Sequence, residues 1–267
     1  MIGRKKGRGR AGRPGYEHGE PAWVALSASD ATAAQRFYEG LFGWLAQPVP
    51  QPGPAESATF HLDGAAVAGV GPPLAEGRPG AWLAHLAVDS CDAVAERAVG
   101  EGGTVLVAPA DVGDAGRLAV LADPGGAAVA TWEGRARPGA GLKGRPGSFC
   151  WTELATREVA ASRTFYERLF GWEANELDFG AGTYTEWRLG SRSVAGMVAM
   201  GPKWPPEVPA HWLVYFAVGD CEEAGERVVA LGGEVAVPCT DIPPGRFSVV
   251  RDPQGAVCAL IRLAVPD

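Results

Sequence analysis

An eight-residue block occurs twice in this chain. FYEGLFGW covers residues 37–44 and FYERLFGW covers residues 165–172. The likeness continues through both halves, because LAHLAVDSCDAVAERAV from Leu83 matches LVYFAVGDCEEAGERVV from Leu213, and ADPGGAAVATW from Ala122 matches RDPQGAVCALI from Arg251. A repeat of this length indicates a tandem duplication, so the two halves are expected to form the same fold.

Each half shows the same order of predicted elements. The runs AWVALSA and CWTELAT mix aliphatic and polar residues, as half-buried strands do. Apolar residues at helical spacing predict helices over 30–42 and 158–170, and Gly43 and Gly171 end these helices as left-handed caps. A strand, a helix and further strands then recur, and the last two strands meet at an Asp-Pro-x-Gly hairpin turn. Each half is therefore predicted to contain two βαβββ units, and the fold class is α+β.

The predicted domain boundaries follow composition. Residues 134–147, GRARPGAGLKGRPG, are rich in Gly, Pro and Arg without apolar periodicity, which indicates a linker. This linker separates a first domain over 21–133 from a second domain over 148–264. Residues 1–20 are predicted to be a disordered basic tail, because the chain begins with a Gly-rich run of Lys and Arg that contains no acid.

Composition also limits the class of protein. Hydrophobic residues make up 46% of the chain, enough for two ordinary cores, and a formal net charge of -7 argues against a nucleic-acid platform. No apolar run reaches the roughly 18 residues of a membrane-spanning helix, and the N-terminus lacks the apolar segment of a secretory signal. We therefore expect a cytoplasmic protein. The five cysteines contain no CxxC pair and are predicted to be reduced thiols rather than a disulfide or zinc framework.

These features together resemble the vicinal oxygen chelate superfamily, which includes glyoxalase I, bleomycin resistance proteins and extradiol dioxygenases. The paired βαβββ units, the helix ending in FY…LFGW, the strand HLAVDS and the final DPxG hairpin carry the resemblance. It covers roughly residues 21–264, and more narrowly the chain resembles two-domain actinobacterial members usually named glyoxalase-like proteins or hydroxylases. The resemblance implies four units that form two cup-shaped mixed sheets with helices outside, so that each half encloses its own pocket.

The resemblance also says where a metal site would lie. Metal enzymes of this superfamily use His or Glu from the first and last strands of each unit, ligands that suit divalent iron, nickel, zinc or manganese. The matching positions in the two halves hold Trp23, His85 and Ala130, and Trp151, Tyr215 and Ala259. The fourth position falls within AAVAGVGP or RSVAGMVAM, which contain neither a carboxylate nor an imidazole. One imidazole cannot hold a divalent ion against water, so no cofactor is expected. A divalent metal is the alternative, since a register shift of one or two residues would involve Glu153 or His211.

Aromatic residues dominate the predicted cup positions. Broad aromatic walls with a few polar tips suit a flat organic ligand. The predicted ligand-binding residues are Trp23, Trp151, Trp82, Trp212, Trp187 and His211. The alternative is that the tryptophans only fill the cups and that His211 caps its strand.

Three side chains are candidates for catalysis. His85 has an ordinary pKa near neutral pH, and Tyr215 could donate to a ligand carbonyl. Glu153 shares the face of Trp151, where aromatic surroundings would raise the pKa of the carboxyl and make it a base. His85 could equally be a satisfied structural residue. Because Glu153 and Tyr215 align with Ala25 and His85, the two cups are not expected to hold the same chemistry.

The leading hypothesis is a metal-independent protein that binds a small aromatic or polycyclic, polyketide-like metabolite in secondary metabolism or self-resistance. Whether it also transforms the ligand stays open, and an enzyme of this kind would use cofactor-independent acid–base catalysis of the cyclase, isomerase or lyase type. The alternatives are a metal-dependent glyoxalase-like lyase or dioxygenase, and an interaction module with empty cups. No nucleic-acid or membrane partner is expected, and four units in one chain suit either a monomer or a homodimer.

Overall fold

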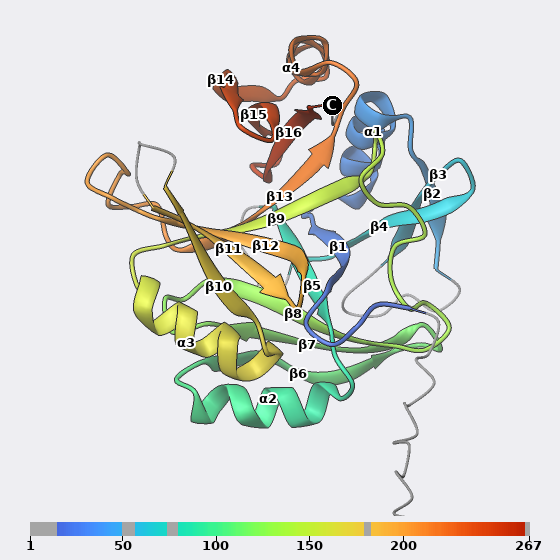
Figure 1. The fold of residues 1–267 in the computed structure, drawn as a ribbon. Helices are drawn as coiled ribbons and strands as arrows, with labels where there is room; N and C mark the ends of the chain where they lie inside the picture. The colour runs from blue at the N-terminus through green and yellow to red at the C-terminus, as the bar shows by residue number, and fades with distance from the viewer. Residues whose placement is uncertain (1–14, 50–56, 74–79, 179–182, 265–267) are drawn as a thin grey trace, which may run out of the picture.

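A computed structural model describes residues 15–49, 57–73, 80–178 and 183–264. Within these residues each half forms one eight-stranded sheet (Figure 1). The elements of the first half are β1 (Pro21–Ser27), α1 (Ala31–Phe42), β2 (Leu45–Pro48), β3 (Ala58–Leu62), β4 (Ala65–Gly71), β5 (Ala81–Ala87), α2 (Cys91–Gly100), β6 (Thr104–Val112), β7 (Gly116–Ala122) and β8 (Ala128–Gly134). Those of the second half are β9 (Phe149–Thr156), α3 (Val159–Phe170), β10 (Glu173–Asp178), β11 (Thr183–Leu189), β12 (Arg192–Ala199), β13 (His211–Ala217), α4 (Cys221–Ala230), β14 (Glu234–Ile242), β15 (Gly245–Arg251) and β16 (Val257–Leu263). The predicted α+β fold with four βαβββ units is confirmed.

Local sequence signals explain where the helices begin and end. The side chain of Asp30 accepts a hydrogen bond from the Ala33 amide at 2.9 Å and so caps α1. Asp220 caps α4 in the same way. Gly43 and Gly171 have φ angles of 72° and 68°, the left-handed conformation that their sequence context predicts. Both copies of the repeated block therefore make the same turn from helix to strand.

Each sheet is built around a central antiparallel pair of strands. The first sheet has the order β2-β3-β4-β1-β5-β8-β7-β6, in which β1 is antiparallel to β5 and parallel to β4. The second sheet repeats this order as β10-β11-β12-β9-β13-β16-β15-β14. The strands that open the two units of one half are thus neighbours at the centre of its sheet. Side chains alternate along them between a face covered by helices and a face without helices.

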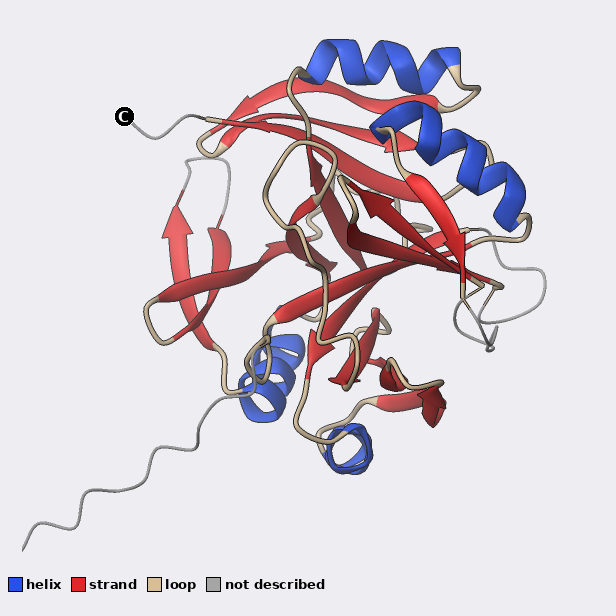
Figure 2. Ribbon diagram, turned by 90° about the vertical axis from the view of Figure 1, so that its right-hand side faces the viewer, coloured by secondary structure: helices blue, strands red, loops and turns tan. Residues whose placement is uncertain are grey.

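The helices cover the sheets in pairs drawn from different halves. Helix α1 lies against α4, and α2 lies against α3, an arrangement visible in both ribbon views (Figures 1 and 2). One buried core joins Phe37 of the first unit to Leu260 of the last, and a second core joins Leu121 to Phe165. The two halves therefore share their hydrophobic cores. No helix in the described residues is both long enough and apolar enough to cross a membrane.

Two buried hydrogen-bond chains also cross between the halves. The Tyr38 hydroxyl donates to Asp252 Oδ2 at 3.1 Å and accepts from Trp82 Nε1 at 2.9 Å. The other chain repeats this arrangement at 3.3 and 2.8 Å with Tyr166, Asp123 and Trp212. The tyrosine of each repeated block therefore reaches the Asp-Pro-x-Gly turn of the opposite half.

Three tryptophans lie elsewhere than predicted. Trp82 and Trp212 face the helices and not the cups, because their indole groups meet the tyrosines of α1 and α3. Trp187 also lies in the helix-facing core, where its ring packs 5.5 Å from that of Trp172. The alternation of side chains along a strand explains why Trp82 and Trp212 face the helices. Trp82 lies three residues from His85, and an odd separation places two side chains on opposite faces.

Residues 15–20 pack against the body of the protein. The Tyr16 hydroxyl donates to the Ala140 carbonyl at 2.9 Å, and His18 Nε2 lies 3.1 Å from the Leu169 carbonyl oxygen. The Gly19 amide donates to the carbonyl of β5 residue Ala87 at 2.7 Å. The predicted disordered tail is therefore too long at its C-terminal end, and its residues 1–14 lie outside the described residues.

Candidate functional site

The helix-free faces of the two sheets carry the candidate residues. We call the face of β1, β5 and β8 the first cup and the face of β9, β13 and β16 the second cup. The backbone register places Trp23 opposite His85 in the first cup and Trp151 opposite Tyr215 in the second. His85 also pairs with Ala130, and Tyr215 with Ala259. Each set of three aligned positions thus forms one row across three adjacent strands.

An arginine from the linker fills the first cup. The guanidinium carbon of Arg137 lies 4.4 Å from the ring centroid of Trp23 and 5.0 Å from that of Trp132. Its Nη1 donates to Thr59 Oγ1 at 3.3 Å, and Trp132 Nε1 donates to the Arg137 carbonyl at 2.9 Å. Cation–π contacts of this kind contribute about 0.5–1 kcal/mol at exposed sites and more when desolvated. The tryptophans of the first cup are therefore already occupied by the chain itself.

His85 is buried beside this arginine. The imidazole Nδ1 lies 3.0 Å from the Leu83 carbonyl oxygen. Burial lowers the pKa of His85 to about 3, the carbonyl of Leu83 opposes this shift, and the positive charge of Arg137 adds to it. A cavity of about 20 Å³ remains next to the ring, which is room for about one water molecule. Burial therefore favours the uncharged imidazole at neutral pH, and the cavity that the described residues leave beside it has room for one water molecule rather than for a metabolite.

The second cup holds a carboxylate bound by two tyrosines. The Tyr215 hydroxyl donates to Glu153 Oε1 at 3.0 Å, and the Tyr184 hydroxyl also hydrogen-bonds to Glu153. Trp151 Nε1 donates to the Tyr184 oxygen at 3.0 Å. Burial raises the pKa of the Glu153 carboxyl, and the hydrogen bonds from Tyr215 and Tyr184 only partly oppose this rise. The cup thus combines predicted residues Trp151, Glu153 and Tyr215 in one connected cluster.

A glycine on the neighbouring strand makes room for this cluster. Gly196 of β12 pairs with Glu153 of β9 in the sheet. A Cβ atom at position 196 would lie 1.8 Å from the Tyr184 hydroxyl oxygen and 3.1 Å from Trp151 Nε1. Any side chain at this position would therefore displace Tyr184 from its hydrogen bonds.

Apolar side chains surround the cluster, and several of them reach solvent. Leu213 and Ile261 are buried, whereas Trp151, Phe247 and Val249 are partly exposed. Their counterparts in the first cup are all buried, with exposed fractions of 1%, 4% and 0% for Trp23, Leu118 and Val120. The second cup is therefore the more accessible of the two.

His211 lies where β13 begins, at the edge of the second cup. It pairs with Ala155 and alternates with Leu213 and Tyr215, so its side chain shares their face. Its Nδ1 lies 2.9 Å from the Pro209 carbonyl oxygen, and its ring is 6.1 Å from that of Trp204. This position suits a residue at the entrance of the cup, which leaves its predicted role in ligand binding as a prediction.

The side chains in the two rows do not fit a divalent metal ion. The row through β1, β5 and β8 offers one imidazole, that of His85, and the row through β9, β13 and β16 offers none. The nearest carboxylate, Glu153, is bound by tyrosine hydroxyls. In the part of the chain that the structure describes, no three His, Cys, Asp or Glu side chains gather in one place. Metal sites of this type require three or four such ligands.

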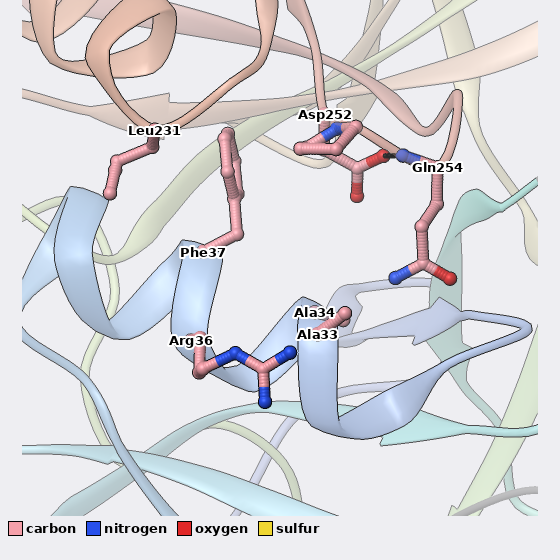
Figure 3. Close-up of a pocket in the computed structure, with 8 residues that line it drawn as sticks. Ala33, Ala34, Arg36, Phe37, Leu231, Asp252 and Gln254 are labelled. Carbon is pink, nitrogen blue, oxygen red and sulfur yellow. Dashed lines mark hydrogen bonds between the residues drawn. The ribbon is translucent and has the colours of Figure 1, made fainter.

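A groove of about 240 Å³ opens elsewhere, between α1 and the turn from β15 to β16. Figure 3 shows Phe37 of the helix pointing towards the turn near Asp252, and the Gln254 side chain reaching towards Ala33 and Ala34. Asp252 Oδ1 accepts from the amides of Gln254 and Ala256 at 2.8 and 2.9 Å, and its Oδ2 accepts from Tyr38. The carboxylate in this groove is therefore engaged in shaping the turn and joining the halves.

Sequence reasoning missed three residues of the cups. Arg137 lies in a Gly- and Pro-rich linker, where composition gives no sign that one side chain enters a cup. Tyr184 and Gly196 lie on strands whose partners were not predicted. The one available signal is the alternation of Tyr184 with Glu186, which indicates a strand but does not identify its neighbour.

Known proteins with related sequences match almost the whole chain. The protein called "Putative glyoxylase CFP32" from Mycobacterium tuberculosis is 39% identical over 258 residues, which cover 94% of this chain and 98% of the relative. Anthracycline biosynthesis protein DnrV from Streptomyces peucetius is 38% identical over 262 residues, which cover 93% of this chain and 94% of the relative.

Solved structures share the fold at low sequence identity. The Mn(II)-bound glyoxalase from Novosphingobium aromaticivorans superposes with a TM-score of 0.64 at 18% identity, covering 92% of this chain and 82% of that protein. The 2,3-dioxygenase LapB from Pseudomonas sp. KL28 gives a TM-score of 0.64 at 12% identity, covering 94% and 95%. The sequence profile of the Glyoxalase/Bleomycin resistance protein/Dioxygenase superfamily matches residues 21–131 and 148–260, one match for each half. With the repeated βαβββ units, these matches show that the chain belongs to this superfamily.

Proposed function

We propose that this protein binds a small aromatic, polyketide-like metabolite in the second cup, without a metal ion. The observation that carries the proposal is Glu153, a carboxylate bound by two tyrosines within an apolar and partly exposed cup. Flat organic ligands bind in such sites by stacking on rings, while a few polar groups set their orientation. In this cup Trp151 and Phe247 would supply the ring contacts and Glu153 the polar one.

The side chains that fill the first cup support the assignment of ligand binding to the second cup. Arg137 occupies the space between Trp23 and Trp132, and His85 is buried and uncharged. A ligand that entered the first cup would have to displace the arginine and the linker backbone that carries it. Among the described residues, no arginine or lysine lies over the ring of Trp151 in the way that Arg137 lies over that of Trp23.

The named relatives favour a polycyclic ligand. A protein 38% identical to this chain is named for anthracycline biosynthesis, and anthracyclines are polycyclic aromatic compounds. A role in the secondary metabolism of such compounds, or in protection from them, agrees with a cup of this chemistry.

Proton transfer at the same site is the catalytic form of the proposal. The raised pKa of the Glu153 carboxyl brings its titration closer to neutral pH, which suits a general base or acid. Glu153 would remove a proton from the bound metabolite in an isomerisation or cyclisation. The hydrogen bond that Tyr215 donates to Glu153 would hold the carboxyl group in place during this transfer.

Ligand titration of matched variants tests the proposal. We expect 2-naphthol and 2-hydroxyanthraquinone to quench tryptophan fluorescence. We expect Phe247→Ala to weaken binding roughly tenfold, because the ring loses about 1.4 kcal/mol of apolar contact. Leu118→Ala is the matched control, since Leu118 occupies the equivalent position in the first cup and its loss should leave the affinity of the folded protein unchanged. Weakened binding in the Leu118 variant alone would assign the ligand to the first cup.

Two further measurements separate binding from chemistry. Mass analysis of the recovered ligand detects turnover, and turnover that disappears in Glu153→Gln identifies an enzyme with Glu153 as its acid or base. Metal analysis of protein purified without chelators addresses the alternative of a lyase or dioxygenase. One tightly held equivalent of a divalent metal per chain would overturn the metal-independent proposal.

A further inference from the structure

We infer that the second cup prefers ligands that carry a hydrogen-bond donor, such as a phenol or enol hydroxyl, over otherwise identical ligands that carry only acceptors. The inference rests on the proposed function, because it names the chemical class that the same cup selects. Glu153 is the residue that determines this preference.

The polar hydrogens of Tyr215, Tyr184 and Trp151 are already used in hydrogen bonds within the cluster. Tyr215 uses its hydroxyl hydrogen on Glu153 Oε1, and Tyr184 is hydrogen-bonded to the same carboxylate. The indole hydrogen of Trp151 is donated to the Tyr184 oxygen at 3.0 Å. A phenol has one hydroxyl hydrogen and an indole has one N–H, so these groups have no further hydrogen to offer a ligand.

Glu153 in contrast retains capacity to accept hydrogen bonds. An ionised carboxylate has about four lone-pair sites, of which the two tyrosines use two. Its side chain is partly exposed to a cup with apolar walls formed by residues such as Leu213 and Phe247. A ligand that displaces water from this cup must satisfy the remaining sites, since a buried acceptor left without a partner is costly.

A ligand oxygen that can only accept hydrogen bonds would face a carboxylate that is also an acceptor, so neither partner would supply a hydrogen. This arrangement provides no hydrogen bond, and the negative charge of Glu153 repels the partial charge of a carbonyl or ether oxygen. A hydroxyl at the same place donates and removes the penalty. Burial raises the pKa of Glu153, and a donated hydrogen bond from the ligand stabilises the carboxylate that burial disfavours.

The neighbouring polar side chains do not reverse this polarity. Glu186, which pairs with Gly196 and lies on the same strand face as Tyr184, is a second acceptor. It already accepts hydrogen bonds from Asn175 Nδ2 at 2.9 Å and from the Ser193 hydroxyl. Apart from His211 at the edge of the cup, whose ring has a second nitrogen beyond the one near Pro209, the polar groups named here are acceptors or committed donors.

A matched pair of ligands tests the preference. We would measure the binding of 2-naphthol and 2-methoxynaphthalene by equilibrium dialysis at pH 8, where Glu153 is more fully ionised and a phenol keeps its proton. A hydrogen bond to a charged acceptor changes affinity by about 10- to 100-fold, and we expect the wild-type protein to prefer 2-naphthol by that factor. The preference should fall below about threefold in Glu153→Gln, whose amide can donate as well as accept.

Two controls keep the result interpretable. Glu176→Gln changes an exposed carboxylate that pairs with Arg163 and should preserve the wild-type preference. The circular dichroism spectrum of Glu153→Gln is the second control, because a native spectrum shows that the variant is folded.

The outcomes separate this inference from the proposed function. Equal binding of the two compounds to the wild-type protein would overturn the inference while the proposed binding function stands. A preference that persists in a folded Glu153→Gln variant would also overturn it, because another group would then be the acceptor. If neither these compounds nor the anthraquinone bind, the proposed function fails and the inference fails with it.

Discussion

Replacement of Tyr166 by phenylalanine tests how the two halves are joined. The phenol oxygen is the partner of two buried groups, because it accepts from Trp212 Nε1 at 2.8 Å and donates to Asp123 Oδ2 at 3.3 Å. Phenylalanine keeps the ring contacts but leaves the indole N–H without an acceptor, which costs about 1–3 kcal/mol. Asp123 keeps hydrogen bonds from the Ala127 amide and the Ser162 hydroxyl, so its own loss is smaller. We expect a total decrease of about 2–4 kcal/mol in the free energy of unfolding.

The pseudo-symmetry of the chain supplies both the comparison and the control. Tyr38→Phe removes the equivalent hydroxyl between Trp82 and Asp252 and should cost a similar amount. Tyr16→Phe removes a hydroxyl that bonds to a backbone carbonyl near the surface and should cost less than about 1 kcal/mol. Urea unfolding followed by circular dichroism and by tryptophan fluorescence measures all three variants.

Two results would refute the conclusion that buried hydrogen bonds and shared cores hold the two halves together. A decrease below about 0.5 kcal/mol for both buried tyrosines would show that the crossing hydrogen bonds contribute little to stability. Separate unfolding transitions for the two probes in the wild-type protein would show that the halves unfold independently, whereas shared cores require one coincident transition.

Four other substitutions or titrations have defined outcomes. The pKa of Glu153 is raised from 4.5, so its charge destabilises the fold as the pH rises above that value, and the stability of the wild-type protein relative to Glu153→Gln should fall between pH 4 and pH 8 in urea titrations. The pKa of His85 is lowered to about 3 from 6.5, so imidazole NMR shifts should show a neutral ring at pH 5, and stability contributed by the neutral form should be lost as the pH falls from 6.5 towards 3. Arg137→Ala should lower the melting temperature by removing two ring contacts worth about 1–2 kcal/mol together, and an unchanged melting temperature would contradict a stabilising role for Arg137 in the first cup. Gly196→Ala should abolish binding of 2-naphthol in the second cup while the circular dichroism spectrum stays native, because its Cβ meets the Tyr184 hydroxyl.

The fold could be predicted because its signals are local and occur twice. Gly43 and Gly171 end their helices, and an Asp-Pro-x-Gly turn closes each half, whatever the rest of the chain does. The exchange of helix partners between the halves had no such signal. The exchange depends on which helix packs against which sheet. The sequence around Phe37 and Phe165 has the same apolar pattern whether these residues pack within one half or across both halves.

The candidate site could be predicted only in part. Alternation along one strand placed Trp151 and Glu153 on the same face, and the structure agrees. The same rule, applied from His85, places Trp82 on the opposite face, where the structure has it. Arg137 was not accessible to this reasoning, because periodicity is informative only within regular elements and this residue lies in a linker.

The position of Glu153 explains how one scaffold presents a different set of side chains in its second half. The row of Trp151, Tyr215 and Ala259 provides no ligand set for a metal ion, and Glu153 lies two residues further along β9 on the same face. Two residues correspond to roughly 7 Å along a strand, so the carboxylate lies beyond that row, and Tyr215 reaches out of the row to bind it. Tyr184 approaches from the other side, through the space that Gly196 leaves open. The polar centre of this cup is therefore defined by hydrogen bonds among three side chains, and a substitution that moves any one of them should alter ligand binding before it alters the fold.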